Sequence, residues 1–268
     1  MSFGTIEGMS DEQNKSLRSW YWYDWANQAF ALTVGTVLGG QLITRYFNLA
    51  TGGTSQIAGL NVTGTSFYAA VLGLSMVFVA ISSPILGAIA DRIPIKKKIV
   101  WIYTIIGVVF TAFMGIAPHL DENSAYRLLA FCFLMGQIGM AGGNTIYYAF
   151  MPYLSDESQM EKISSWGYSY GFAGGSLILI IHLIVMGSGA FGLTSEYGDW
   201  TLTFAFVTTS LWWLGFGLPF FRNTPEPKIP NEKTYESAME ALRDGINEVK
   251  GTFREVRKYR ILVIYLLA

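Results

Sequence analysis

Six long apolar runs separated by short polar segments dominate the sequence. Each run is long enough, at about 1.5 Å of helical rise per residue, to cross a hydrocarbon core of roughly 30 Å. A bilayer interior offers no water to backbone amides, so runs of this length must be helical. We therefore predict six transmembrane helices, over residues 25–46, 67–90, 99–117, 128–150, 166–186 and 200–221.

The composition agrees with a membrane protein. Of the 268 residues, 51% are hydrophobic and only 14% are charged, whereas an ordinary soluble domain carries about 25% charged residues. The lipid bilayer is therefore the expected partner, and with a net charge of −1 nucleic acid is not.

The distribution of basic residues predicts the sidedness of the chain. Sixteen of the 18 Lys and Arg residues lie in the N-terminal segment, the second-to-third and fourth-to-fifth loops, or after the sixth run. Only Arg45 and Arg127 lie on the other side. Because positive residues stay in the cytoplasm, we predict a cytoplasmic N-terminus over 1–24 and a six-helix bundle over 25–221.

The segment over 222–258 is predicted to be a cytoplasmic linker with an amphipathic helix. Prolines mark its first part, and apolar residues then recur every three or four positions from Tyr235 to Val256. Two placements stay open for this helix, on the membrane surface or against the cytoplasmic ends of the spans. Residues 259–268 are expected to be the truncated start of a seventh transmembrane helix.

Enzyme-like patterns lack the context that catalysis needs. Gly167, Ser169 and Gly171 match G-x-S-x-G, but no strand precedes them. Together with Gly175 these glycines predict a helix face that a neighbouring backbone approaches closely. No P-loop, HExxH or CxxC pattern occurs. We expect no enzyme, no cofactor and no metal site.

Three titratable residues lie in or beside the runs, where burial of charge is costly and functional roles are frequent. Asp24 precedes the first run, Asp91 follows the second, and His182 lies inside the fifth. The alternatives are a helix N-cap for Asp24, a solvated loop charge for Asp91, and a neutral hydrogen-bonding role for His182.

Amides and phenols form a second set of polar residues within the runs. We expect them either to join helices by hydrogen bonds or to line the path of a solute. The candidates for the path are Asn27, Gln28, Asn144, Tyr147 and Tyr148.

The loop between the second and third runs resembles the signature loop of the major facilitator superfamily. It reads Gly87-x-x-x-Asp91-Arg92 followed by basic residues. Pro94 and Ile95 replace the usual glycine and arginine of that loop. The resemblance implies that Asp91 and Arg92 link helix ends and hold one face of the protein closed. We predict that Asp24 joins them in a cytoplasmic gate. Lys96 to Lys98 are interpreted as membrane-surface anchors.

Three further stretches are similar to the vacuole effluxer family within that superfamily, which contains autophagy-related amino-acid exporters. They are YDWANQAFA from Tyr23, GGNTIYYAFMPYL from Gly142 and SWGYSYGFAGG from Ser165. The resemblance implies an all-α membrane protein whose first six-helix bundle partners a C-terminal six-helix half of the same protein. It also implies the plasma membrane for a bacterial protein and the vacuolar membrane for a fungal one.

The function predicted from these features is transport of a small polar solute by alternating access, with amino-acid efflux as the leading example. Proton coupling and passive facilitation both stay open. Other solutes, such as sugars, peptides or drugs, are an alternative. So is a transport-inactive membrane scaffold or sensor that presents the amphipathic cytoplasmic helix.

Overall fold

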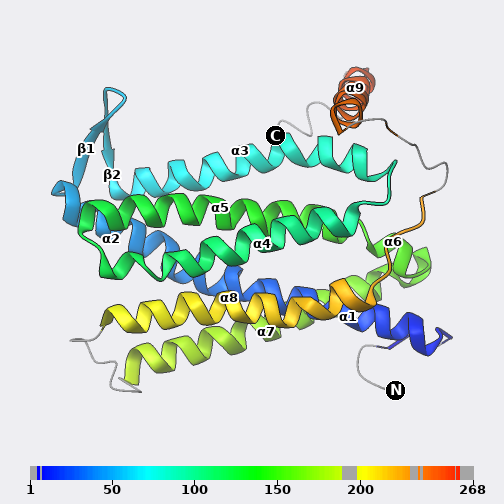
Figure 1. Ribbon diagram of the computed structural model, residues 1–268, viewed down its shortest axis with the longest axis horizontal. Helices are drawn as coiled ribbons and strands as arrows, with labels where there is room; N and C mark the ends of the chain where they lie inside the picture. Colours follow the sequence, from blue (N-terminus) through cyan, green and yellow to red (C-terminus); the bar gives the residue numbers. More distant parts are fainter. Residues whose placement is uncertain are drawn as a thin grey trace.

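The computed structural model describes residues 5–6, 8–188, 198–229, 235, 238–256 and 258–259. In this structure the long helices lie side by side along one axis (Figure 1). Five of them are long and apolar enough to cross a membrane, namely Gly64–Ala90, Lys96–His119, Glu122–Tyr148, Glu157–Gly187 and Trp200–Asn223. The predicted all-α membrane fold is confirmed.

The order of elements follows the predicted runs, with additions between them. The helices and strands are α1 Asp11–Ala29, the π-helix η1 Phe30–Leu38, α2 Gly39–Thr51, β1 Thr54–Ile57, β2 Leu60–Thr63, α3 Gly64–Ala90, α4 Lys96–Met114, the 3-10 helix η2 Ala117–His119, α5 Glu122–Tyr148, α6 Met151–Leu154, the 3-10 helix η3 Glu157–Gln159, α7 Met160–Ser188, α8 Gly198–Asn223 and α9 Ala238–Val256.

The first predicted run, 25–46, differs from the other five. It is helical throughout, but α1, η1 and α2 share it, and the π-helix lies at its centre. It is not among the five apolar helices because α1 is polar and α2 has only 13 residues. The three elements lie alongside the other helices (Figure 1), and a membrane crossing by this segment stays a prediction.

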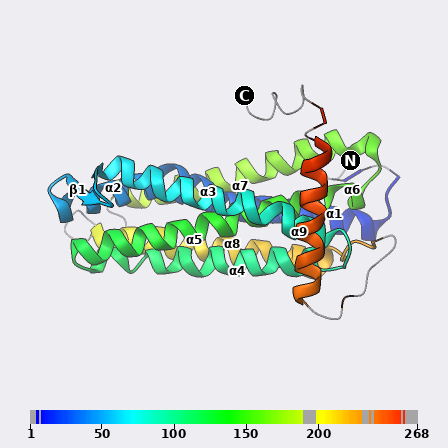
Figure 2. The same ribbon diagram turned by 90° about the horizontal axis from the view of Figure 1, so that it is seen from above.

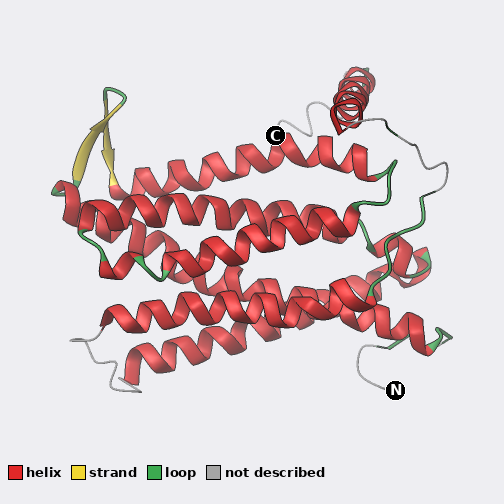
Figure 3. Cartoon of the chain, in the orientation of Figure 1, coloured by secondary structure: helices red, strands yellow, loops and turns green. Residues whose placement is uncertain are grey.

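The bundle has two distinct ends (Figure 1). At one, which we call the connector end, lie the start of α1, the loop 91–95, α6 and α9. At the other, the hairpin end, β1 and β2 form an antiparallel hairpin that pairs Thr54 with Thr63 and Ile57 with Leu60 (Figure 3). The sequence predicted the connector end to be cytoplasmic and gave no sign of the hairpin.

Side chains fix where several helices begin. Ser10 and Gln13 form a reciprocal capping box at the start of α1, with Ser10 Oγ accepting from the Gln13 amide at 3.2 Å. Asp121 caps α5 by accepting from the amides of Asn123 and Ser124, each at 3.1 Å. Hydrogen bonds from Ser124 hold the pKa of Asp121, which lies in the loop, below its usual range.

Glycines allow the closest approaches inside the bundle. A Cβ atom at Gly139 of α5 would lie 2.5 Å from the Gly107 amide nitrogen of α4. On another side of Gly107 lies the ring of Trp213 from α8, which is fully buried. Close contact of this kind is the usual means by which membrane helices pack, and here it joins α4, α5 and α8.

Helix α9 runs crosswise to the long helices and lies over the connector end of α3 (Figure 2). Gly245 faces α3, where a Cβ atom would lie 2.9 Å from Ile89 Cγ1 and 3.2 Å from the Ile85 carbonyl oxygen. Of the two placements predicted for the amphipathic helix, the structure thus shows packing against a span. Of residues 259–268, predicted to begin a seventh span, 260–268 lie outside the described residues.

Candidate functional site

Asp24 lies inside the bundle, where α1 meets α5 and α7. Its side chain is buried, and the Tyr148 hydroxyl donates to Asp24 Oδ1 at 3.4 Å. Asp24 Oδ2 has no hydrogen-bond partner among the described residues. The N-cap alternative for Asp24 is wrong, because α1 begins more than ten residues earlier and is capped by Ser10.

Two asparagines join α1 to α5 close to this carboxylate. Asn27 Nδ2 donates to Asn144 Oδ1 at 2.6 Å, and Asn27 Oδ1 has no partner in the described part of the chain. Asn27 is fully buried, whereas Asn144 is partly exposed. The pair therefore reaches from the packed interior to the open face of the bundle.

Tyr147 is placed differently from its neighbour Tyr148. Its hydroxyl donates to the Trp20 carbonyl oxygen at 2.7 Å, and Trp20 Nε1 donates back to the Tyr147 carbonyl oxygen at 3.3 Å. The two rings stack with centroids 4.7 Å apart. Tyr147 is fully buried, so we assign it to joining α1 and α5, while Tyr148 remains partly exposed.

A glycine face on α7 allows α1 to approach closely, as the sequence predicted. Cβ atoms at Gly167, Gly171 and Gly175 would lie 2.9 Å from the Trp20 ring, 2.8 Å from Gln28 Cγ and 2.7 Å from the Gln28 carbonyl oxygen, respectively. Gln28 is partly exposed beside this contact. The G-x-S-x-G match is thus part of a helix, and its serine hydroxyl donates to the Ser165 carbonyl oxygen at 2.8 Å.

His182 joins three helical segments through both of its ring nitrogens. Its Nδ1 lies 3.1 Å from the Thr33 hydroxyl of η1, and its Nε2 lies 2.8 Å from the Thr208 hydroxyl of α8. The Thr208 hydroxyl donates to the Phe204 carbonyl oxygen at 2.6 Å, so it accepts from His182 Nε2–H. A neutral imidazole then accepts from Thr33 at Nδ1, which agrees with the neutral alternative.

At the connector end, Asp91 pairs with Lys96 instead of with its neighbour Arg92. Lys96 Nζ lies 2.5 Å from Asp91 Oδ1 and donates to the Ala90 carbonyl oxygen at 2.7 Å. The Lys96 side chain is 2% exposed, whereas that of Asp91 is 67% exposed. The prediction that Lys96 is a membrane-surface anchor is wrong. Its ammonium group is buried and caps the last residue of α3, Ala90, instead of lying at the membrane surface.

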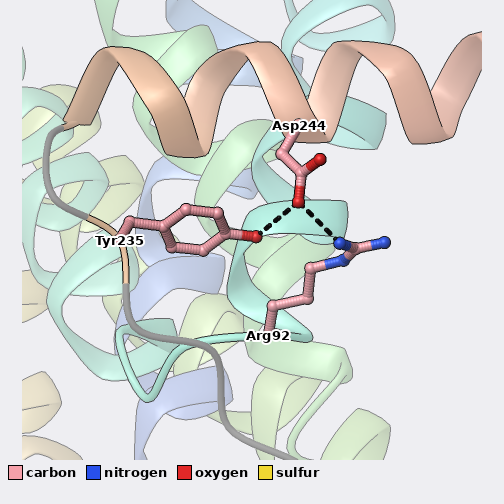
Figure 4. A network of polar contacts seen from close by, with 3 residues as sticks. All are labelled: Arg92, Tyr235 and Asp244. Atoms are coloured by element: carbon pink, nitrogen blue, oxygen red, sulfur yellow. Dashed lines mark hydrogen bonds and ion pairs between the residues drawn. The ribbon is translucent and has the colours of Figure 1, made fainter.

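Arg92 contacts the connector helix (Figure 4). Its Nη1 lies 2.7 Å from Asp244 Oδ2 of α9, and the Tyr235 hydroxyl donates to the same oxygen at 2.9 Å. The neighbour of Asp244, Gly245, packs on Ile89 of α3. Packing on α3 and the Arg92–Asp244 ion pair therefore hold α9 across the loop that joins α3 to α4.

The predicted site residues thus fall into two groups. Asp24, Asn27, Gln28, Asn144 and Tyr148 lie together between α1, α5 and α7, with Tyr147 buried behind them. Asp91 and Arg92 lie at the connector end, and Asp24 contacts Tyr148 instead of joining them in one gate cluster. Within the described ranges, no three His, Cys, Asp or Glu side chains lie close enough to hold a metal ion.

Sequence reasoning missed three residues of the connector end. Lys96 was grouped with Lys97 and Lys98 by charge alone, although it alone of the three is buried. By sequence, Tyr235 is only the first of the apolar residues that recur up to Val256, and Asp244 is one of several charged residues in the same segment. The available signal was the acid beside a glycine, Asp244-Gly245, in an amphipathic helix that follows a basic loop.

Comparisons with known proteins agree with this architecture. The sequence model of a family described as "Vacuole effluxer Atg22 like" matches residues 12–268. The chain is also 25% identical over 255 residues to a protein of Bacillus subtilis (strain 168) called "Uncharacterized MFS-type transporter YxiO". That match covers 95% of the chain but only 56% of the relative, so the chain spans little more than half the relative's length.

Proposed function

Since the chain belongs to the vacuole effluxer Atg22-like family, we propose that the full-length protein carries a small polar solute across a membrane by alternating access. The solute class that we favour is the neutral amino acids. The observation that supports this proposal is the polar group that Asp24 and Asn27 of α1 form with Asn144 of α5. Two of its oxygens, Asp24 Oδ2 and Asn27 Oδ1, have no partner among the described residues.

These oxygens have the chemistry to recognise a polar solute. A buried acceptor without a donor is unfavourable by about 1–3 kcal/mol, and a bound ammonium or hydroxyl group removes that penalty. The partly exposed Gln28, Asn144 and Tyr148 connect the two oxygens to the open face of the bundle. A solute bound there contacts α1 and α5 together.

The test of this site is transport by the full-length protein reconstituted in liposomes. We expect uptake or counterflow of neutral amino acids in a panel that also contains sugars, peptides and drugs. Asn144→Ala leaves the Asn27 amide unpaired and should lower kcat/KM about tenfold. The matched control is Thr145→Ala on the next residue, which is exposed and bonds only the Ala141 carbonyl oxygen. Equal kinetics in both variants would refute the site.

The connector end serves as the gate in this proposal. Opening a path at that end requires α3 and α4 to move, and α9 and the Arg92–Asp244 ion pair lie across their loop. Asp91→Asn and Arg92→Ala should therefore reduce turnover more than expression. Normal transport rates in both variants would refute the gate. The packing of α9 on α3 also disfavours a scaffold that presents this helix to partners.

Asp24 is the group that we assign to a coupled proton. Both nitrogens of His182 are bonded to threonines, whereas one oxygen of Asp24 has no partner in the described part of the chain. Asparagine at position 24 keeps an oxygen that accepts a hydrogen bond from the solute but cannot take up a proton. Stimulation of transport by a pH gradient should therefore disappear in Asp24→Asn while counterflow of the solute persists. Unchanged stimulation in this variant would contradict the assignment.

A further inference from the structure

An open groove lies between α2 and the start of α3, toward the hairpin end. Its volume is about 770 Å³, within the range of small-molecule sites. Among its lining residues, Gln41, Thr44, Arg45 and Asn48 come from α2. The pairs Gln41–Arg45 and Thr44–Asn48 are each four apart, so these polar side chains share one helix face.

A tyrosine from α3 forms the opposite wall of the groove. A Cβ atom at Gly40 would lie 3.0 Å from the Tyr68 ring, so glycine at this position is what allows the ring to pack against α2. The groove lining carries no Asp or Glu. It is a concave surface with amide and hydroxyl groups and a single positive charge.

The sequence predicts that two arginines, Arg45 and Arg127, lie on the side of the membrane opposite the cytoplasm. Their surroundings in the structure differ. Arg127 Nε donates to the Tyr126 hydroxyl at 3.2 Å, and its guanidinium lies over the Tyr126 ring at 5.6 Å from the centroid. Arg45 makes no hydrogen bond or ion pair with any described residue. Arg45 is exposed near the end of the first predicted run, so its guanidinium is accessible to a solute that enters the groove.

We propose that this groove binds the carboxylate of the transported solute, with Arg45 as the cation. The planar guanidinium matches a carboxylate with two parallel hydrogen bonds, and the amides of Gln41 and Asn48 add further donors. This inference rests on the proposed function and deepens it. The carboxylate end of the solute meets Arg45 at the hairpin end before the solute reaches the polar residues of α1 and α5.

The test compares two solutes that differ only in the carboxylate. Full-length protein in liposomes is assayed with radiolabelled leucine, and with leucinamide as a competitor that lacks the negative charge. Arg45→Gln should raise the KM for leucine at least tenfold and abolish the preference for leucine over leucinamide. Arg45→Lys, which keeps the charge but not the two-pronged geometry, should give an intermediate KM. Arg127→Gln is the matched control and should behave as wild type.

Each outcome decides the inference. Equal KM values in Arg45→Gln and Arg127→Gln overturn it. An equal loss of affinity for leucine and leucinamide in Arg45→Gln also overturns it, because the effect of Arg45 then does not depend on the carboxylate of the solute. If Arg45→Gln does not elute as a folded protein in size-exclusion chromatography, Arg45→Lys takes its place. An unchanged KM for leucine in Arg45→Lys then overturns the inference. If the wild-type protein transports only solutes without a carboxylate, this inference is refuted but the proposed function is not. If the wild-type protein transports no solute in the panel, the proposed function is refuted.

Discussion

The two ends of the bundle differ in whether their charged side chains form ion pairs. At the connector end, Asp91 pairs with Lys96 and Arg92 with Asp244, so the described acids and bases of that loop hold helices together. At the hairpin end, Arg45 lies in an open groove with no ion-pair partner among the described residues. In our two proposals, the paired charges close the connector end, and the charge of Arg45 at the hairpin end binds the solute.

Removing one partner of the Asp91–Lys96 pair should have the largest effect on stability. Breaking a fully buried pair costs about 3–5 kcal/mol. Because the Asp91 side chain is 67% exposed, we expect a loss of about 2 kcal/mol in Asp91→Asn, measured by thermal unfolding in detergent. The control is Glu255→Gln, which breaks the exposed pair with Lys258 and should change stability by less than about 1 kcal/mol. Equal effects would show that Lys96 does not depend on its partner.

A larger side chain at Gly245 should separate α9 from α3. In Gly245→Leu the new side chain meets Ile89 and the Ile85 carbonyl oxygen, and overpacking of this kind costs about 1–3 kcal/mol. Faster amide hydrogen exchange across α9 is the expected result. Gly251→Leu is the control, because a Cβ atom at position 251 on the same helix meets nothing within 4 Å. Identical exchange in both variants would contradict the packing of α9.

The Arg92–Asp244 ion pair should contribute less than the Asp91–Lys96 pair. The two side chains are 24% and 37% exposed, and partly exposed pairs of this kind contribute about 0.2–1 kcal/mol. A double-mutant cycle with Arg92→Ala and Asp244→Ala should therefore give a coupling energy of about 1 kcal/mol. A coupling energy of zero would mean that this ion pair does not help to hold α9 on α3.

The smallest expected effect lies in the hairpin. Ala58 has a φ of 51° and Gly59 a φ of 79°, the left-handed combination that two-residue hairpin turns prefer as Asn-Gly. Ala58→Asn should relieve the unfavourable φ of alanine and raise stability by roughly 0.5 kcal/mol without changing transport. A change in KM in this variant would show that the hairpin belongs to the solute path.

The helical bundle could be predicted from the sequence, because an apolar run long enough to cross a bilayer must be helical to satisfy its backbone hydrogen bonds. The glycine face of Gly167, Gly171 and Gly175 was also readable, since a period of four residues places its members on one side of a helix. The π-helix over Phe30–Leu38 was not. At the end of this π-helix a Cβ atom at Gly39 would lie 2.5 Å from the Phe133 ring of α5, a contact that no local sequence pattern shows.

The candidate site was predictable in its residue types and less so in its pairings. Polar side chains within apolar runs identified Asn27, Asn144 and Tyr148. No local pattern showed that Asp91 would pair with Lys96, or that Arg92 would reach Asp244, which lies 152 residues further along the chain. Such pairings depend on how helices are placed in space. The sequence also gives no reason to expect that Tyr147 is buried while its neighbour Tyr148 is partly exposed.

A gate at the connector end is tested most directly by cross-linking α9 to α3 and measuring transport. Ile89→Cys combined with Gly245→Cys places two thiols where a Cβ atom at position 245 already lies 2.9 Å from Ile89 Cγ1, and the native Cys132 is buried. Oxidation of the full-length double variant in liposomes should stop transport, and reduction should restore it, while each single variant stays active under both conditions. Transport that continues at the wild-type rate with the disulfide formed would contradict a gate at the connector end.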